Sequence, residues 1–124
     1  VQLKPDGPVG GGLSAERGRE EGLAEDGGAI SWWGVAGYVR WAVSPRLCLA
    51  LRAERFEDED GARTGTAQRL DALTFTPSFT LAPGLVVRAD LRLDLSDQPA
   101  FEDEDGLLTK KRQPTLLLNA LWAF

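Results

Sequence analysis

Strict alternation of apolar and polar residues is the feature that most constrains the fold of this chain. From Leu85 to Leu95 every odd position is apolar, whereas the even positions include Arg88, Asp90, Arg92 and Asp94. A helix would scatter these charges around its surface. A β-strand places them all on one side, because successive side chains of a strand point to opposite faces. The segment is therefore predicted to be a strand with one apolar and one charged face.

The same alternation recurs at residues 33–43, 47–54, 73–81 and 116–124. A weaker, Gly-rich strand is expected at Val9–Arg17, and Val1–Leu3 is expected to be the end of a further strand. Pro77 falls on the apolar side of its strand and removes one donor from the hydrogen-bond ladder, which predicts a bulge or a local distortion at that point. The chain is therefore predicted to be all-β, with about six strands and the end of a seventh.

Short turns alternate with long polar loops. Short turns are expected near residues 4–7, 44–46 and 82–84, where Pro sets the turn geometry, accompanied by Gly in two of them. Long loops are expected at residues 18–28, 57–68 and 96–113, and the hexapeptide Phe56–Gly61 recurs as Phe101–Gly106 at or within two of these loops. This layout is typical of an antiparallel up-and-down β-barrel of an outer membrane, which has tight turns on the periplasmic side and long loops outside.

Six or seven strands are too few for such a barrel, which needs about eight or more to close. The chain begins at Val1 in the middle of a strand pattern, without a signal peptide. We therefore expect it to be the C-terminal segment of a larger transmembrane barrel, forming a single domain over residues 1–124. The alternative is a soluble or surface β-sandwich that binds a partner through its acidic loops.

Aromatic residues cluster near the ends of the expected strands, as in the aromatic girdles of membrane barrels. Trp41, Phe79, Trp122 and Phe124 fall near one rim, and Trp32, Trp33, Phe56 and Phe101 fall toward the other. We take Trp33, Trp41, Phe79 and Trp122 as the candidate aromatic girdle.

The polar face supplies candidates for the lining of a pore, which selects by its width and by the charges along its wall. The candidates are Arg40, Arg52, Glu54, Arg88, Asp90, Arg92 and Asp94, with Thr74, Thr76 and Ser78 as neutral lining. Two interpretations stay open: the charges set up a transverse field that biases the passage of ions, or they form a salt-bridge ladder that stabilises the wall or plugs a narrow lumen.

Composition excludes several other functions. The chain of 124 residues has no His, one Cys and no G-x-S-x-G element, so we expect no enzyme, no cofactor and no metal site built from several cysteines. The net charge of −5 argues against nucleic acid as a partner. The acidic loops suit a hard cation such as Ca²⁺, but charge runs in loops are usually just solvated, so metal binding there is left open. Lys110–Arg112 could pair with these acids or contact anionic lipid.

The closing run Leu118-x-Ala120-x-Trp122-x-Phe124 resembles the C-terminal assembly signal of bacterial outer-membrane barrels. Together with Trp32–Tyr38, Leu51–Gly65, Leu73–Pro77 and Leu91–Asp94, it resembles the C-terminal portion of the OmpL-like β-barrel outer-membrane porin family. The resemblance implies a channel in the outer membrane of a Gram-negative-type bacterium that passes small hydrophilic solutes or ions by passive diffusion. It also implies that the lipid bilayer with its lipopolysaccharide leaflet and the barrel assembly machinery are partners. Solute, strand number and homo-oligomer formation stay open.

Overall fold

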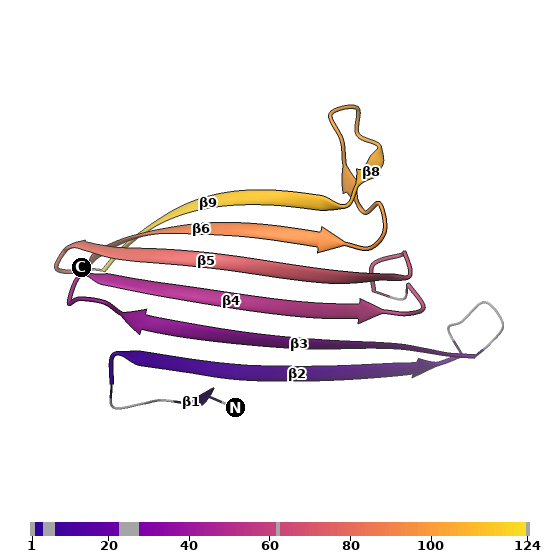
Figure 1. The fold of residues 1–124 in the computed structure, drawn as a ribbon, viewed down its shortest axis with the longest axis horizontal. Helices are drawn as coiled ribbons and strands as arrows, with labels where there is room; N and C mark the ends of the chain where they lie inside the picture. Colours follow the sequence, from indigo (N-terminus) through magenta and orange to yellow (C-terminus); the bar gives the residue numbers. More distant parts are fainter. Residues whose placement is uncertain (1, 4–6, 23–27, 62, 124) are drawn as a thin grey trace.

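The computed structural model describes residues 2–3, 7–22, 28–61 and 63–123, and these residues contain strands as their regular structure (Figure 1). The long strands are β2 (Val9–Glu21), β3 (Ala29–Ala42), β4 (Leu47–Asp58), β5 (Gln68–Ala82), β6 (Leu85–Ser96) and β9 (Arg112–Trp122). The short ones are β1 (Gln2–Leu3), β7 (Phe101–Glu102) and β8 (Leu108–Lys110). No helix in this part of the chain is long and apolar enough to span a membrane.

Seven strands form one sheet in the order β1-β2-β3-β4-β5-β6-β9, in which every neighbouring pair is antiparallel. The sheet therefore follows chain order, as expected for an up-and-down meander. No pairing joins β1 or β2 to β9 among the described residues, so the sheet is open. The antiparallel all-β sheet agrees with the expected barrel segment, whereas closure by further strands stays a prediction. Among the described residues, no second sheet covers either face as a sandwich would require.

Two of the short turns have a clear local cause. Between β3 and β4, the Ser44 hydroxyl accepts hydrogen bonds from the backbone N–H groups of Arg46 and Leu47. Between β5 and β6, Pro83 fixes its own φ and Gly84 takes a positive φ of 78°, the combination that a type II turn requires. The third expected turn, at residues 4–7, falls largely outside the described residues.

The other end of the sheet carries the long connections. There the strands run further than the sequence predicts, because β2 continues to Glu21 and pairs with the start of β3, from Gly18↔Trp32 to Glu21↔Ala29. The connection from β6 to β9 was expected to be an unstructured loop, but it contains the hairpin β7–β8, which stands away from the sheet in Figure 1. Strands of two and three residues are too short to show alternation in a sequence.

Register fixes the two faces of the sheet. Leu51, Phe75, Leu91 and Leu116 share one row across β4, β5, β6 and β9, and Arg52, Thr74, Arg92 and Thr115 share the next. We call the side of the first row the apolar face and the side of the second row the polar face. All the pore-lining candidates lie on the polar face.

Of the bulge or local distortion predicted at Pro77, the structure shows the local distortion. Pro77 pairs with Leu49 of β4, and the ladder to β6 is interrupted at Thr76 and Pro77 but resumes at Ser78↔Arg88 in the same register. The missing N–H of Pro77 thus costs local hydrogen bonding without shifting the strands. The register shift lies instead between Thr80 and Ala82, next to the tight turn.

The sheet has almost no apolar core. Among the described residues only Ile30 and Ala36 are buried apolar side chains. Large apolar side chains of the apolar face are strongly exposed, with Leu13, Leu118 and Trp122 at 69%, 72% and 69%. The apolar face therefore presents a broad and largely exposed apolar surface in this part of the chain.

Candidate functional site

The centre of the polar face holds a chain of four charges from two strands that are not neighbours. Glu54 of β4 accepts a hydrogen bond from Arg52 (Nη2–Oε1, 2.8 Å) and another from Arg92 of β6 (Nη1–Oε2, 2.9 Å). Arg92 also forms an ion pair with Asp94 at 2.8 Å. The intervening strand β5 offers the small Ala72 between Glu54 and Asp94, so Arg92 can reach across it.

A second cluster joins three neighbouring strands around Asp90. The Thr76 hydroxyl of β5 donates to Asp90 Oδ1 at 2.6 Å, and the Asn119 amide of β9 donates to Oδ2 at 3.4 Å. Arg88 Nε lies 3.7 Å from the same Oδ2. The clusters border a hollow of about 500 Å³, which Tyr38, Thr74 and Thr115 also line. Thr74 Oγ1 is buried without a hydrogen-bond partner among the described residues.

The charges of both clusters remain in reach of solvent. The side chains of Arg52 and Arg88 are 47% and 51% exposed, and those of Glu54 and Asp94 are 25% and 21% exposed. Charges in a dry interior would need complete pairing, whereas charges beside water do not. The polar face therefore suits an aqueous space.

Arg40 differs from the other cations of this face. It is exposed, lies in the row of Ala50 and Thr76, and forms no salt bridge within the part of the chain that the structure describes. Ser78 lies on the same face, in a row with Cys48 and Arg88. Arg40 thus leaves a positive charge without an ion-pair partner among the described residues, toward the short-turn end of the polar face.

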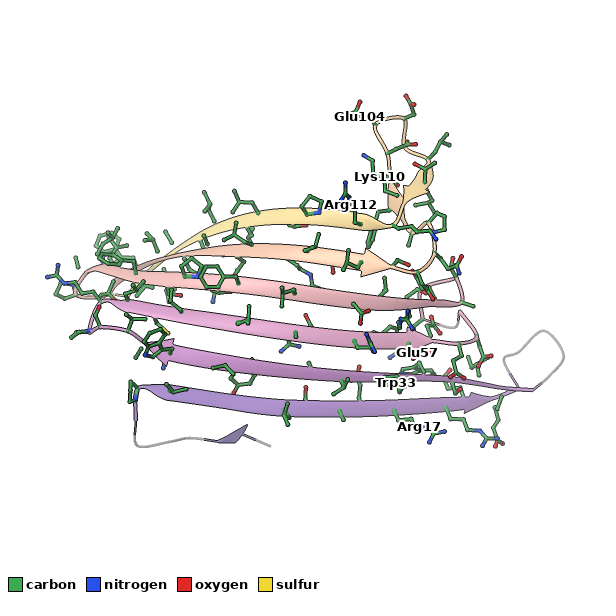
Figure 2. The ribbon with its side chains drawn as sticks, viewed as in Figure 1. Arg17, Trp33, Glu57, Glu104, Lys110 and Arg112 are labelled. Carbon is green, nitrogen blue, oxygen red and sulfur yellow. The ribbon has the colours of Figure 1, made fainter. Side chains whose placement is uncertain are left out.

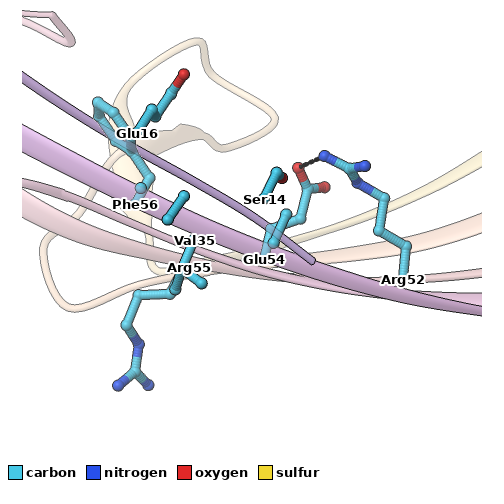
Figure 3. Close-up of a pocket in the computed structure, with 10 residues that line it drawn as sticks. Ser14, Glu16, Val35, Arg52, Glu54, Arg55 and Phe56 are labelled. Carbon is cyan, nitrogen blue, oxygen red and sulfur yellow. Dashed lines mark hydrogen bonds and ion pairs between the residues drawn. The ribbon is translucent and has the colours of Figure 1, made fainter. Parts of the chain in front are cut away.

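A smaller hollow of about 210 Å³ lies toward the long loops (Figure 3). Gly34 and Ala36 of β3 form its floor, and Ser14, Glu16, Glu54 and Phe56 rise on either side of it. Figure 3 shows Arg55 pointing to the opposite side of the sheet, as its register position requires. Glu16 makes no ion pair with the described residues, so this end of the wall presents an uncompensated carboxylate.

Glu16, Tyr38, Thr115 and Asn119 also lie on this face, although they are not among the predicted pore-lining residues. Parity does place Tyr38 on the polar side of its alternating strand, between Gly37 and Val39. Glu16 escaped because glycines weaken the alternation in β2. Asn119 and Thr115 stand among leucines on both faces of β9, so the polar side of that strand shows poorly in the sequence.

The repeated acidic hexapeptide forms the same turn twice. In both copies the backbone N–H of the sixth residue, Gly61 or Gly106, donates a hydrogen bond to the carbonyl oxygen of the third residue, Asp58 or Asp103, at 3.3 and 3.2 Å. Both glycines have positive φ values, 69° and 77°. Because other residues rarely adopt a positive φ, this turn explains why both copies of the hexapeptide have Gly at the sixth position.

The Asp side chains of these turns bind the backbone of their own loops. Asp58 is fully buried and accepts bonds from the N–H groups of Arg63 and Thr64 and from the Thr64 hydroxyl. Asp103 accepts bonds from the N–H groups of Asp105 and Leu107 and from the Thr109 hydroxyl. Its pKa is lowered, first by the Thr109 hydroxyl and then by the Leu107 N–H. The acids thus organise the loops, and the described residues contain no cluster of three or more ligating side chains suited to a metal.

Aromatic side chains of the predicted girdle occupy both ends of the apolar face. Trp41, Phe79 and Trp122 lie on it toward the short turns and are 49%, 40% and 69% exposed. Trp33 lies on it toward the long loops, between Arg17 and Glu57 (Figure 2).

Trp32 and Phe56 were expected at the long-loop rim as well, but register turns both toward the polar face. There the Arg63 guanidinium lies over the Trp32 ring in a cation–π contact, with its Cζ 4.6 Å from the ring centroid. Neither residue can therefore belong to an outward girdle.

The predicted assembly signal lies on the apolar face of the last strand. Leu118 and Ala120 stand opposite Ala89 and Val87, and Trp122 stands opposite Leu85. Its final residue, Phe124, falls outside the described residues.

Comparison with known families gives one match. The sequence model described as "Putative beta-barrel porin-2, OmpL-like" matches residues 9–124. No curated protein and no solved structure gives a significant match to the chain.

Proposed function

The chain belongs to the OmpL-like β-barrel porin-2 family, and we propose that it forms part of the wall of an outer-membrane channel for passive diffusion of small hydrophilic solutes or ions. The observation that carries the proposal is the division of one sheet into an exposed apolar face and a charged, solvent-accessible face. In this assignment the apolar face contacts lipid, and the polar face lines the lumen. Residues outside the described sheet, or outside this chain, complete the barrel.

The height of the apolar face supports a bilayer as its partner. The apolar stripe of β6 runs from Leu85 to Leu95. Ten steps of about 3.4 Å make about 34 Å along the strand, and a strand tilt of about 40° reduces this to about 26 Å along the membrane normal. The expected apolar band of an outer-membrane barrel is about 25 Å tall. Trp41 and Trp33 then lie near its two borders.

The arrangement of the charges favours a solute path over a sealed wall. Arg52, Glu54, Arg92 and Asp94 neutralise one another along the wall, while Arg40 and Glu16 present single charges at different heights. A permeating ion would meet a weak positive site toward the short turns and a weak negative site toward the long loops. Such a wall admits small polar solutes of either charge.

The test is single-channel conductance of the complete protein in a planar bilayer. Stepwise currents with a defined reversal potential in a salt gradient support the proposal. A folded, membrane-inserted protein without current contradicts it, and the paired charges would then act as a ladder that stabilises or plugs the barrel. Heat-modifiable migration in a gel, checked on the same sample, distinguishes such a protein from one that failed to fold.

The same proposal makes the last strand an assembly signal read by the barrel assembly machinery. Replacing Phe124 with Ala should lower the amount of assembled protein in the outer membrane. Replacing it with Tyr keeps the terminal ring and should leave assembly close to normal. Equal assembly of both variants would contradict the role of Phe124.

A further inference from the structure

A basic hollow lies where the β7–β8 hairpin meets the sheet. Lys110, Lys111, Arg112 and Pro114 line its volume of about 500 Å³, and Figure 2 shows Lys110 and Arg112 at this junction. Lys111 Nζ donates to the backbone oxygen of Asp97 at 2.8 Å, which fixes this stretch against the end of β6. Within the described residues, no salt bridge joins Lys110 or Arg112 to a carboxylate. Lys110 lies close enough to Asp103 to help lower the pKa of that carboxyl, but the two groups form no ion pair. The hollow therefore concentrates three cations with only partial compensation by the protein.

An apolar groove continues from this hollow along the apolar face. Pro114 lines both the basic hollow and a neighbouring one of about 390 Å³, whose other walls include Leu73, Leu91, Leu93 and Leu116. A third hollow of about 470 Å³ follows along the same strands. Its outward walls are Phe79, Val87, Ala89, Leu118 and Ala120. A charged head site thus opens onto apolar hollows that follow β5, β6 and β9.

Charge is distributed unequally between the two ends of the apolar face. Strand residues of this face near the long loops include the cations Arg17, Arg55, Arg69 and Arg112 and the acids Glu57 and Asp71. Asp71 pairs with Arg55 at 2.6 Å and with Arg69 at 3.9 Å, so cations are in excess at this end, and Arg112 forms no ion pair among the described residues. Strand residues near the short turns are apolar or aromatic, such as Val9, Trp41 and Leu85. Guanidinium and ammonium groups just beyond an apolar band match phosphate groups of lipid heads. Long loops lie on the outer side of outer-membrane barrels, so the basic end faces the outer leaflet.

We propose that the basic hollow and the adjoining apolar groove bind one molecule of a phosphorylated, multiply acylated glycolipid of the outer leaflet, of the lipid A type. Its phosphate lies among Lys110, Lys111 and Arg112, and its acyl chains lie along Leu91, Leu93 and Leu116. The positive charge of the basic hollow is complementary to a phosphate. Because Pro114 lines both this hollow and the adjoining apolar one, a molecule with both a charged head and apolar chains fits better than a free anion. The inference rests on the proposed membrane location but does not require that the barrel conduct.

Binding is measured with the complete protein folded in detergent micelles, by native mass spectrometry and titration with bis-phosphorylated lipid A. The variant Lys110→Gln/Lys111→Gln/Arg112→Gln should bind about 100-fold more weakly, since each cation near a membrane surface contributes about fivefold. The control Arg40→Gln/Arg46→Gln/Arg88→Gln removes the same charge from the polar face and a short turn, away from the hollow, and should bind within about threefold of the parent.

A second pair of variants tests the apolar groove. Leu93→Trp fills the hollow and should weaken lipid A binding. Leu51→Trp makes the same change on the apolar face of β4, outside the hollow, and should not. Both variants keep the face apolar, and heat-modifiable migration confirms that each has folded.

Several results would overturn the inference. Equal loss of binding in the two triple variants would show a general charge effect. If phosphatidylglycerol binds as tightly as lipid A, the site has no preference for the glycolipid. If inorganic pyrophosphate competes with lipid A and Leu93→Trp has no effect, the hollow is only an anion site. Because binding is measured without a bilayer current, absence of conductance would contradict the proposed channel and leave this result intact.

Discussion

Replacing Glu54 with Gln should destabilise the folded protein by about 1–2 kcal/mol. The Glu54 carboxylate joins Arg52 of its own strand to Arg92 of β6 through hydrogen bonds of 2.8 and 2.9 Å. Charge-assisted bonds contribute about 1.5–3 kcal/mol when they are buried, whereas exposed ion pairs contribute about 0.2–1 kcal/mol. Glu54 is 25% exposed and its partners 47% and 39%, so each bond belongs near the upper end of the exposed range.

The assay is urea unfolding of the complete protein in lipid vesicles, followed by tryptophan fluorescence. Glu16→Gln is the matched control, because Glu16 lies on the same face without an ion pair to the described residues, and its change should stay within about 0.5 kcal/mol. A double-mutant cycle of Glu54→Gln with Arg92→Gln should give a coupling of about 0.5–1 kcal/mol. A coupling of zero, or equal effects of Glu54→Gln and Glu16→Gln, would refute the reasoning.

Three further predictions follow from other parts of the molecule. In low salt, Arg40→Gln should shift the cation-to-anion permeability ratio about fivefold toward cations, because a unit charge about 8 Å from an ion in water contributes about 0.5 kcal/mol, with opposite sign for a cation and an anion. Glu16→Gln should shift the reversal potential the opposite way, and a shift in the same direction would contradict the assignment. The Thr109 hydroxyl and the Leu107 N–H hold the pKa of Asp103 below its ordinary 3.8, so the Asp103 carboxylate stabilises the β7–β8 hairpin fully above pH 3.8 and loses this effect as the pH falls through the lower folded pKa. Thr109→Val should raise the pKa of Asp103 measured by NMR, and an unchanged titration would contradict this. Gly84→Ala should destabilise the protein by about 2 kcal/mol or more in the same unfolding assay, because a Cβ at that positive φ would collide with the Ala123 carbonyl oxygen. The control Gly65→Ala, which has a similar φ but open space around the added Cβ, should destabilise it by about 1 kcal/mol.

Alternation made the faces of this protein predictable from its sequence. Parity alone placed Arg52, Arg92 and Asp94 on one face, because a strand offers each side chain only two directions and register then aligns the strands. The family resemblance, drawn from residues such as those of the closing strand, is confirmed by the family match over residues 9–124. Closure of the barrel depends on contacts beyond the described sheet, so parity could not establish it.

The failures of prediction share a physical cause, which is that short or irregular pieces carry too few alternations. The hairpin β7–β8 is held by two residue pairs, Phe101↔Lys110 and Glu102↔Leu108, and by the Asp103 side chain. Trp32 and Phe56 were assigned by distance along the chain, although their even positions already gave the polar face. At Pro77, where a bulge or a local distortion was expected, only the distortion occurs, because a ladder can lose one bond while keeping its register.

The energetics of the single sheet support the lipid contact proposed for its apolar face. Side chains such as Leu118 and Trp122 leave about 70% of their surface uncovered by protein, at 72% and 69%. Covering the exposed half of a large apolar side chain contributes about 1 kcal/mol. That gain recurs in each long strand, whereas a whole domain is stable by only about 5–15 kcal/mol. In water this surface would drive aggregation, and in a bilayer it becomes the main source of stability. The polar face has the opposite requirement, because its arginines and carboxylates keep part of their hydration. The proposed position in a barrel wall, with lipid on one side and water on the other, meets both requirements.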